Sequence, residues 1–136
     1  MMDKKIMVVD DDPDILVFLR TVFEQQGYEV LTVDSGRDCI EELKRGFKGI
    51  VLMDLMMPFI DGWDTLKEII KHGLNKDIVI SILTANGAPD PEKMKRLDPY
   101  IHNYIKKPFD LEKLILDINS INVSKEVNNS KKSRNY

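Results

Sequence analysis

The sequence predicts an α/β fold in which a parallel sheet is covered by helices on both sides. Short segments rich in β-branched residues alternate with amphipathic helical segments along the chain. The strand starts are about 22 to 28 residues apart, roughly one strand-helix unit. Three of the strands are apolar throughout, as expected for strands buried on both faces. We therefore expect a doubly wound (βα)5 domain with a five-stranded parallel sheet and right-handed crossovers.

Five segments have the composition of strands. The apolar ones cover residues 5–9, 50–53 and 78–83, the last of them interrupted by Ser81. Residues 28–33 and a weaker segment, 103–105, complete the set. In the strand order 2-1-3-4-5, the first and third strands are neighbours at the point where the order reverses.

Each predicted strand is followed by a helix with its own start signal. In chain order, the signals are Asp12-Pro13, Ser35, Asp61-Gly62, Asp90 or Pro91, and Asp110. Side chains of this type cap helix N-termini by accepting hydrogen bonds from free backbone N–H groups. Gly27 is expected to end the first helix in the left-handed conformation, and the fourth helix is the weakest of the five.

Length and charge describe one compact domain. A chain of 136 residues with 43% hydrophobic and 32% charged residues has the size and balance of a single soluble domain. Its net charge is −3, so it has no overall basic field that would attract DNA or an anionic membrane. We therefore expect no direct nucleic-acid binding.

Cysteine content and hydropathy indicate the compartment. Cys39 is the only cysteine, so no intrachain disulfide can form, and a reducing environment is expected. No apolar run approaches the roughly 20 residues that cross a bilayer. The N-terminal apolar segment is also too short for a signal peptide. These features predict a cytoplasmic protein without membrane insertion.

The last segment differs in composition from the rest. Residues 122–136 contain few apolar side chains and carry a net charge of +3, which leaves −6 for residues 1–121. Such a segment buries too little apolar surface to offset its ordering entropy. We expect a folded domain at 1–121 followed by a polar, disordered tail at 122–136.

Polar residues that could bind a ligand or take part in a reaction lie at the carboxyl ends of the predicted strands. In chain order, they are Asp10 and Asp11, Asp54, Thr84, and Lys107. The carboxyl edge of an open parallel sheet is where ligands bind, so these residues are expected to converge. Three clustered carboxylates repel one another, and a divalent cation would relieve that repulsion. Oxygen ligands without His or Cys favour Mg²⁺ over Zn²⁺.

The remaining polar groups complete a site for phosphoryl transfer. Lys107 contributes a fixed positive charge and Thr84 a hydroxyl donor. Together they can bind the oxygens of a phosphoryl group beside an acidic nucleophile.

Four motifs occur in order on these elements. They are Val8-Val9-Asp10-Asp11, Asp54-Leu55-Met56-Met57-Pro58 with Asp61-Gly62 after it, Leu83-Thr84-Ala85, and Tyr104-Ile105-Lys106-Lys107-Pro108-Phe109. Together they resemble the receiver domain of two-component response regulators, of the stand-alone, CheY-like type. The resemblance covers residues 4–121 and implies a flavodoxin-like fold.

The resemblance also implies a role for each acid. Asp54 would accept a phosphoryl group from a sensor histidine kinase or a phosphotransfer protein. Asp11 and Asp54 would bind Mg²⁺ directly, and Asp10 would bind it through water. The backbone carbonyl of Met56 would complete the metal site. Such a protein catalyses only its own phosphorylation and dephosphorylation and is not otherwise an enzyme.

The same resemblance implies a switch. Lys107 would pair with Asp54 and then with the phosphoryl oxygens, and the Lys107-Pro108 bond would be cis. Thr84 would move toward the phosphoryl group while Tyr104 turns inward. The face made by the fourth helix, the fifth strand and the fifth helix would carry the signal to a downstream effector protein. Tyr104 is also explained by simple packing on an edge strand.

Other functions remain open at the level of sequence. A Mg²⁺-dependent phosphohydrolase with an Asp nucleophile would usually carry a second acid two residues later, where Met56 stands. A receiver-like binding module would never accept phosphate. A flavin-binding protein of this fold class would need a hydroxyl-rich loop after the first strand, where Asp10 and Asp11 would repel phosphate. Formation of a phosphorylation-dependent dimer is also open.

The sequence also predicts the burial or exposure of three residues outside the motifs. Cys39 is expected in the core and His72 in solvent, away from the acids. Trp63 follows Gly62 and is expected to be partly exposed, where it could report ligand binding by its fluorescence.

Overall fold

The computed structural model describes residues 4–55, 61–84 and 91–121, apart from the side chains of Pro91, Lys93 and Met94. The expected tail at 122–136 and the backbone carbonyl of Met56 therefore lie outside the described residues.

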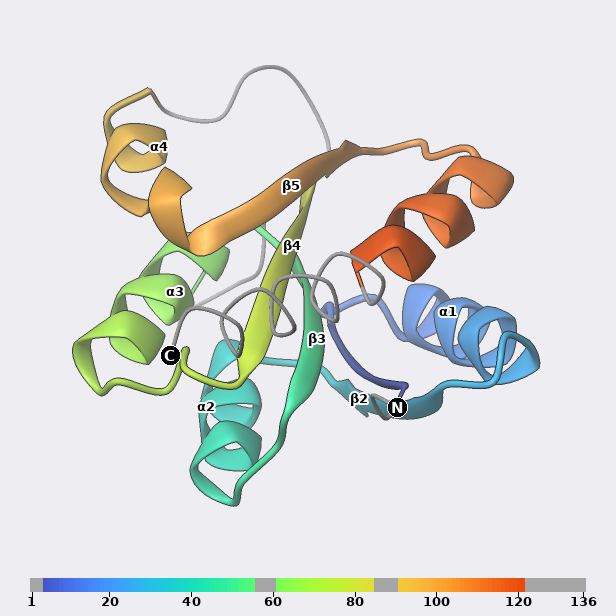
Figure 1. Cartoon of the computed structure of the whole chain (residues 1–136), viewed down its shortest axis with the longest axis horizontal. Coiled ribbons are helices and arrows are strands. Elements are labelled where there is room, and N and C mark those ends of the chain that lie inside the picture. Colours follow the sequence, from blue (N-terminus) through green and yellow to red (C-terminus); the bar gives the residue numbers. More distant parts are fainter. Residues whose placement is uncertain (1–3, 56–60, 85–90, 122–136) are drawn as a thin grey trace, which may run out of the picture.

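One parallel sheet of five strands forms the centre of the domain (Figure 1). Its order is β2-β1-β3-β4-β5, which confirms the predicted 2-1-3-4-5. In chain order, the strands are β1 (Lys5–Val9), β2 (Glu29–Val33), β3 (Gly49–Asp54), β4 (Ile78–Thr84) and β5 (Ile101–Lys106). Strands β2 and β5 are thus the two edges of the sheet.

Strand β5 begins earlier than the predicted 103–105. Ile101 pairs with Ile80 of β4, whereas the next residue of β4, Ser81, pairs with Asn103. The intervening His102 is therefore accommodated at an irregularity in the ladder. The sequence pattern missed this extension because an extra residue breaks the alternation of a strand.

The helices begin close to the predicted signals. They are α1 (Pro13–Gln25), α2 (Gly36–Lys44), α3 (Gly62–Lys71), α4 (Pro91–Leu97) and a final helix at 111–121. Asp12, Ser35 and Asp61 each accept a hydrogen bond from a backbone N–H group in the first turn of their helix. A short 3-10 helix, η1 (Asp98–Tyr100), joins α4 to β5.

Two apolar cores lie on opposite faces of the sheet. On one face, α1 and the final helix pack through Leu19, Phe23 and Leu114. On the other, α2, α3 and α4 cover the sheet, with Leu43 and Leu66 in that core. Figure 1 shows these two groups of helices on either side of the strands. Both faces are covered, which explains why the central strands are apolar throughout.

The expectation for Trp63 was wrong. Its side chain is only 6% exposed and belongs to the core that also contains Leu55 and Leu66. It is buried because the first turn of α3 lies directly against the backbone after β3, where the Gly62 N–H group donates to the Leu55 carbonyl at 3.0 Å. Cys39 is fully buried, as expected, and burial raises the pKa of its thiol to about 12.

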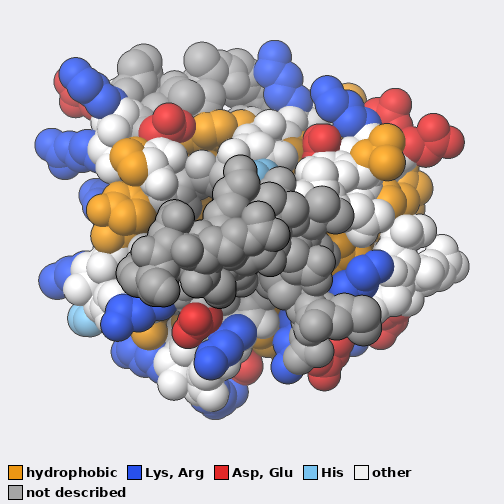
Figure 2. All heavy atoms as spheres, in the orientation of Figure 1, with side chains coloured by type: hydrophobic (Ala, Val, Ile, Leu, Met, Phe, Trp, Pro, Cys, Tyr) orange, Lys and Arg blue, Asp and Glu red, His pale blue; other side chains and the backbone are white. Residues whose placement is uncertain are grey.

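Charged side chains of both signs are interspersed around the face drawn in Figure 2. Among the helices of the described residues, none has the length and apolar content needed to span a bilayer.

Candidate functional site

Three carboxylates meet where β1 and β3 end. Asp10 follows β1 directly and Asp54 is the last residue of β3, and the pairing of Val9 with Met53 places the two ends side by side. Oxygens of Asp10, Asp11 and Asp54 all lie within 4.8 Å of one another. Asp10 is 0% exposed and Asp54 is 4% exposed, whereas Asp11 faces solvent. The cluster therefore has a buried floor and one acid at its mouth.

Hydrogen bonds fix the orientation of Asp10. Its backbone N–H group donates to the carbonyl of Val33 at the end of β2, at 3.2 Å. Its Oδ1 accepts the backbone N–H of Asp12 at 2.9 Å, just before α1 begins. The turn between β1 and α1 therefore helps to set the direction of this carboxylate, whose Oδ2 contacts Lys107.

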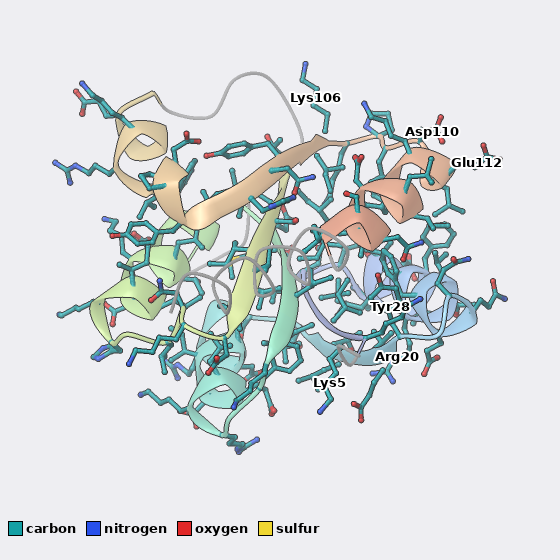
Figure 3. The ribbon with its side chains drawn as sticks, viewed as in Figure 1. Lys5, Arg20, Tyr28, Lys106, Asp110 and Glu112 are labelled. Atoms are coloured by element: carbon teal, nitrogen blue, oxygen red, sulfur yellow. The ribbon has the colours of Figure 1, made fainter. Side chains whose placement is uncertain are left out.

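Lys107 neutralises part of the cluster. Its Nζ donates to Asp10 Oδ2 at 3.1 Å and lies 3.4 Å from Asp54 Oδ2. The residue follows β5, and its backbone N–H group donates to the carbonyl of Thr84 at 2.8 Å. The peptide bond between Lys107 and Pro108 is cis. Figure 3 shows the neighbouring Lys106 pointing away from the domain.

The ammonium group of Lys107 is favoured by its surroundings. Burial works to lower the pKa of Lys107, but the hydrogen bond to Asp10 and the charges of Asp54 and Asp10 outweigh burial and raise the pKa above its ordinary 10.5. Lys107 is therefore positively charged across the physiological range, and it holds two buried carboxylates beside one cation.

Thr84 lies at the same edge of the sheet. It is the last residue of β4 and is 7% exposed. Leu83, directly before it, pairs with Asp54 across the ladder between β3 and β4. Thr84 therefore belongs to the strand that neighbours β3, and it lies one residue further toward the carboxyl edge of the sheet than Asp54 does.

Tyr104 points to a different partner. Its hydroxyl donates to Asp98 Oδ1 at 3.1 Å, in the 3-10 helix η1 before β5. Burial, followed by the hydrogen bond and the negative charge of Asp98, raises the pKa of Tyr104 to about 12. The structure therefore places the Tyr104 hydroxyl beside Asp98 of η1 and not in the cluster of Asp10, Asp11 and Asp54.

A glycine allows the helix after the site to approach the acceptor strand. A Cβ built on Gly62 would lie 2.7 Å from the carbonyl oxygen of Asp54 and 2.7 Å from the Cα of Leu55. No side chain fits into that space. Gly62 is thus required for α3 to begin against the backbone that carries Asp54.

The described donor set suits a hard divalent cation. It consists of carboxylate oxygens from three aspartates, without a His or Cys ligand among the described residues of the group. Oxygen ligands of this kind, with one acid open to solvent to leave room for water, fit Mg²⁺. The fourth expected ligand, Met56, lies outside the part of the chain that the structure describes.

Comparison with known families agrees with this arrangement. Residues 6–119 match the response regulator receiver domain. The chain belongs to this family. Receiver domains are signalling domains of two-component systems and bind Mg²⁺ at an acidic aspartate cluster, in keeping with the grouping of Asp10, Asp11 and Asp54.

Curated and structural relatives support the assignment. The receiver domain is 35% identical over 116 residues to the response regulator SaeR of Staphylococcus aureus strain USA300, covering 85% of this chain and 49% of SaeR. The chain thus spans about half the length of the curated relatives it matches.

Solved receiver domains have the same fold. A CheY-like receiver domain protein from Methanospirillum hungatei JF-1 superposes with a TM-score of 0.81 and 44% identity, over 86% of this chain and 92% of that one. A receiver domain protein from Clostridium thermocellum gives a TM-score of 0.74 and 30% identity, over 90% and 98% of the two chains.

Two contacts of this receiver domain were missed at the level of sequence. Lys107 was expected to pair with Asp54, and the structure adds a shorter contact to Asp10. Asp98 was not assigned a role, although it accepts the Tyr104 hydrogen bond. Nothing in the order of residues indicates that η1 turns Asp98 toward a side chain of the following strand.

Proposed function

We propose that this domain is a phospho-accepting receiver in which Asp54 takes a phosphoryl group from the phosphohistidine of a sensor histidine kinase or a phosphotransfer protein. The observation that carries the proposal is the position of Asp54. Its carboxylate ends a buried strand, lies within 4.8 Å of two further acids and is 3.4 Å from the Lys107 ammonium.

The reaction needs a nucleophile and stabilisation of charge. An oxygen of Asp54 attacks phosphorus, a new P–O bond forms, and the P–N bond to the donor imidazole breaks, leaving the electron pair on the imidazole nitrogen. The product is an acyl phosphate on Asp54. Lys107 is already directed at Asp54 and offers its ammonium protons to the phosphoryl oxygens.

The acids supply the cation site for this reaction. Asp11, Asp54 and the backbone carbonyl of Met56 would hold Mg²⁺, with Asp10 contributing through water. Bound Mg²⁺ would shield the negative charges of the carboxylates and the phosphoryl group from one another. Asp10, held by Asp12 and by Lys107, keeps its carboxylate directed at this volume.

The signal leaves through a change of conformation. A phosphoryl group adds charge and acceptor oxygens, which favour the conformer in which Thr84 and Lys107 reach them. Tyr104 turns inward in that conformer. The face formed by α4, β5 and the final helix then presents a different surface to an effector protein.

The proposal includes the setting of the domain. Residues 1–121 form the receiver and 122–136 a separate polar segment. The protein acts in the cytoplasm, without direct nucleic-acid binding or membrane insertion. The buried free thiol of Cys39 is compatible with a reducing compartment.

Phosphorylation by a small donor tests the proposal. The full chain is incubated with Mg²⁺ and a low-molecular-weight acyl phosphate, and its intact mass is measured. Wild type gains one phosphoryl group, and the gain disappears when Mg²⁺ is chelated. Asp54→Asn gains none, whereas Asp34→Asn, which changes an exposed acid just after β2, behaves as wild type. Equal labelling of Asp54→Asn refutes the assignment.

A further inference from the structure

The Tyr104 hydroxyl is held near the start of β5 by the carboxylate of Asp98. It donates a hydrogen bond to Asp98 Oδ1 at 3.1 Å. Asp98 is the first residue of η1 and is exposed. Figure 1 shows this turn between α4 and the start of β5. The hydrogen bond therefore ties a side chain of β5 to the turn that precedes the strand, and we call this the outward position of Tyr104.

The Tyr104 ring lies on the face of the sheet that also carries Thr84. Tyr104 pairs with Ile82 in the ladder between β4 and β5, and both residues pack in the core on the side of α2, α3 and α4. Thr84 follows Ile82 by two residues, and side chains two residues apart in a strand point to the same face. The Thr84 and Tyr104 side chains therefore share one face. Rotation of the Tyr104 side chain can turn its ring along this face toward Thr84 without a change of strand register.

The backbone on either side of the hydrogen bond is anchored. The N–H group of Ile101 donates to the carbonyl of Asp98, which joins η1 to the first residue of β5. Asn103, directly before Tyr104, accepts a hydrogen bond from the Ser81 hydroxyl, and Ser81 is fully buried. These bonds hold η1 and β5 in place. Rotation of the Tyr104 side chain is therefore the movement that separates its hydroxyl from Asp98.

The hydrogen bond favours the outward position. Its acceptor carries a negative charge, and hydrogen bonds to ionised acceptors are stronger than those between neutral groups. The pKa of Tyr104, about 12, keeps the hydroxyl protonated and able to donate across the physiological range. A ring turned toward Thr84 gives up this bond. The bond therefore stabilises one of two positions of the same side chain.

We propose that Asp98 is a positioning residue that holds Tyr104 outward and thereby opposes the conformer that phosphorylation of Asp54 favours. The inference rests on the proposed function, in which Tyr104 turns inward once Asp54 carries a phosphoryl group. A group that binds only the inward conformer loses affinity in proportion to the fraction of molecules held outward. Removal of Asp98 therefore makes the inward conformer more common before any phosphoryl group is bound.

The position of the Tyr104 side chain in the unphosphorylated full chain tests the first step. Three-bond NMR couplings between its Cγ and the backbone nitrogen and carbonyl carbon measure the χ1 rotamers. In wild type, the rotamer directed at Asp98 predominates. Asp98→Ala raises the ratio of the second rotamer to the first by about threefold or more, because one hydrogen bond is lost.

The control for this measurement is Asp77→Ala, which removes an exposed acid before β4 and leaves the Tyr104 rotamers unchanged. Rotamers of Tyr104 that are the same in wild type and Asp98→Ala overturn the proposal. This readout requires no phosphoryl group, so it tests the contact with Asp98 separately from the proposed function.

Binding of beryllium fluoride in the presence of Mg²⁺ tests the regulatory step, because this anion binds a carboxylate oxygen as an analogue of a phosphoryl group. Asp98→Ala binds it about threefold more tightly than wild type does. Tyr104→Phe removes the same hydrogen bond and gives a similar gain. In the Tyr104→Phe background, Asp98→Ala adds nothing, because the two residues act through one contact. Tyr100→Phe removes a hydroxyl from an exposed tyrosine of η1 and binds as wild type does.

The outcomes separate this inference from the proposed function. If wild type does not bind beryllium fluoride, the proposed function fails and the regulatory role of Asp98 fails with it. If wild type binds it and Asp98→Ala binds it equally well, only the role of Asp98 is overturned. A gain in Asp98→Ala that persists in the Tyr104→Phe background also overturns that role, because Asp98 then acts by a route other than Tyr104.

Discussion

Lys107 Nζ donates a hydrogen bond to Asp10 Oδ2 at 3.1 Å across 97 residues of sequence. The contact joins the segment after β5 to the segment after β1, although β3 and β4 lie between them in the sheet. It also links Lys107 to the N-cap of α1, because Asp10 accepts the Asp12 N–H group through its other oxygen. The ammonium is therefore held by Asp10 as well as by Asp54.

Removal of the Lys107 charge should destabilise the domain. Lys107→Met leaves the buried carboxylates of Asp10 and Asp54 without their cation, at a cost of about 1–3 kcal/mol in the free energy of unfolding. Urea unfolding at pH 7 without Mg²⁺ measures this cost. Lys106→Met, at an exposed neighbouring position, should change stability by less than about 0.5 kcal/mol. Equal effects of the two substitutions would contradict the claim that the contacts of Lys107 with Asp10 and Asp54 stabilise the fold.

The Lys107 contribution should also depend on pH. The pKa of Lys107 in the folded state is raised above 10.5, so folding binds its proton more tightly than the unfolded chain does. The stabilisation is fully present below 10.5 and is lost as the pH rises through the higher folded value. The stability difference between wild type and Lys107→Met should stay constant up to that region and then shrink. A difference that shrinks between pH 6 and 9 would implicate another group.

Magnesium binding should depend on Asp11 and not on Asp12. Asp11→Asn removes a carboxylate from the cluster and should weaken Mg²⁺ binding by about tenfold or more. Asp12→Asn is the matched control, because Asn replaces Asp well as the N-cap of α1 and Asp12 is outside the cluster. Isothermal titration calorimetry with the wild type and both variants distinguishes the two positions. Unchanged affinity in Asp11→Asn would remove it from the ligand set.

Tyr104 should release its proton at lower pH when Asp98 is neutralised. The pKa of Tyr104 is about 12 because of burial and then because of Asp98. In Asp98→Asn the pKa should fall but stay above 10.0, since burial remains. Tyrosinate absorbance measures this, with Tyr104→Phe subtracted to isolate the residue. Asp77→Asn, an exposed acid before β4, is the control for net charge and should leave the Tyr104 titration unchanged.

Gly62 should not tolerate a side chain. Gly62→Ala places a methyl group 2.7 Å from the Asp54 carbonyl oxygen, so α3 or the end of β3 has to move. We expect a loss of about 1–3 kcal/mol in the free energy of unfolding and slower phosphorylation by a small donor. Lys67→Ala, on the exposed side of the same helix, should leave the phosphorylation rate unchanged. A normal rate in Gly62→Ala would show that the position of α3 does not matter to Asp54.

The sheet could be predicted because strands and helix caps have local patterns, and the acid cluster could be predicted because it follows from the strand order. Apolar strands and capping residues gave the order of elements, and the convergence of Asp10 and Asp54 follows from the neighbouring positions of β1 and β3. The burial of Trp63 could not be predicted in the same way. It depends on how closely α3 approaches the backbone after β3, which only the contact between Gly62 and Leu55 determines.

Side-chain partners between elements were harder to foresee. The sequence places Lys107 near the acids, but the choice between Asp10 and Asp54 depends on the direction in which each carboxylate points. The Tyr104 partner depends on η1, a single short turn. The groove beside β2, lined by residues of α1, β2 and α2, likewise results from helix packing and has no motif of its own.

The central claim is that the Asp54 carboxylate carries the phosphoryl group, and mapping the modified atom tests it most directly. The full chain is phosphorylated by the small donor with Mg²⁺ and treated with borohydride, which reduces an acyl phosphate to an alcohol. Peptide sequencing by mass spectrometry then locates the change. We predict homoserine in place of aspartate at residue 54, with Asp10 and Asp11 unchanged. Aspartate retained at residue 54, with the reduced residue elsewhere in the chain, would contradict the proposed function.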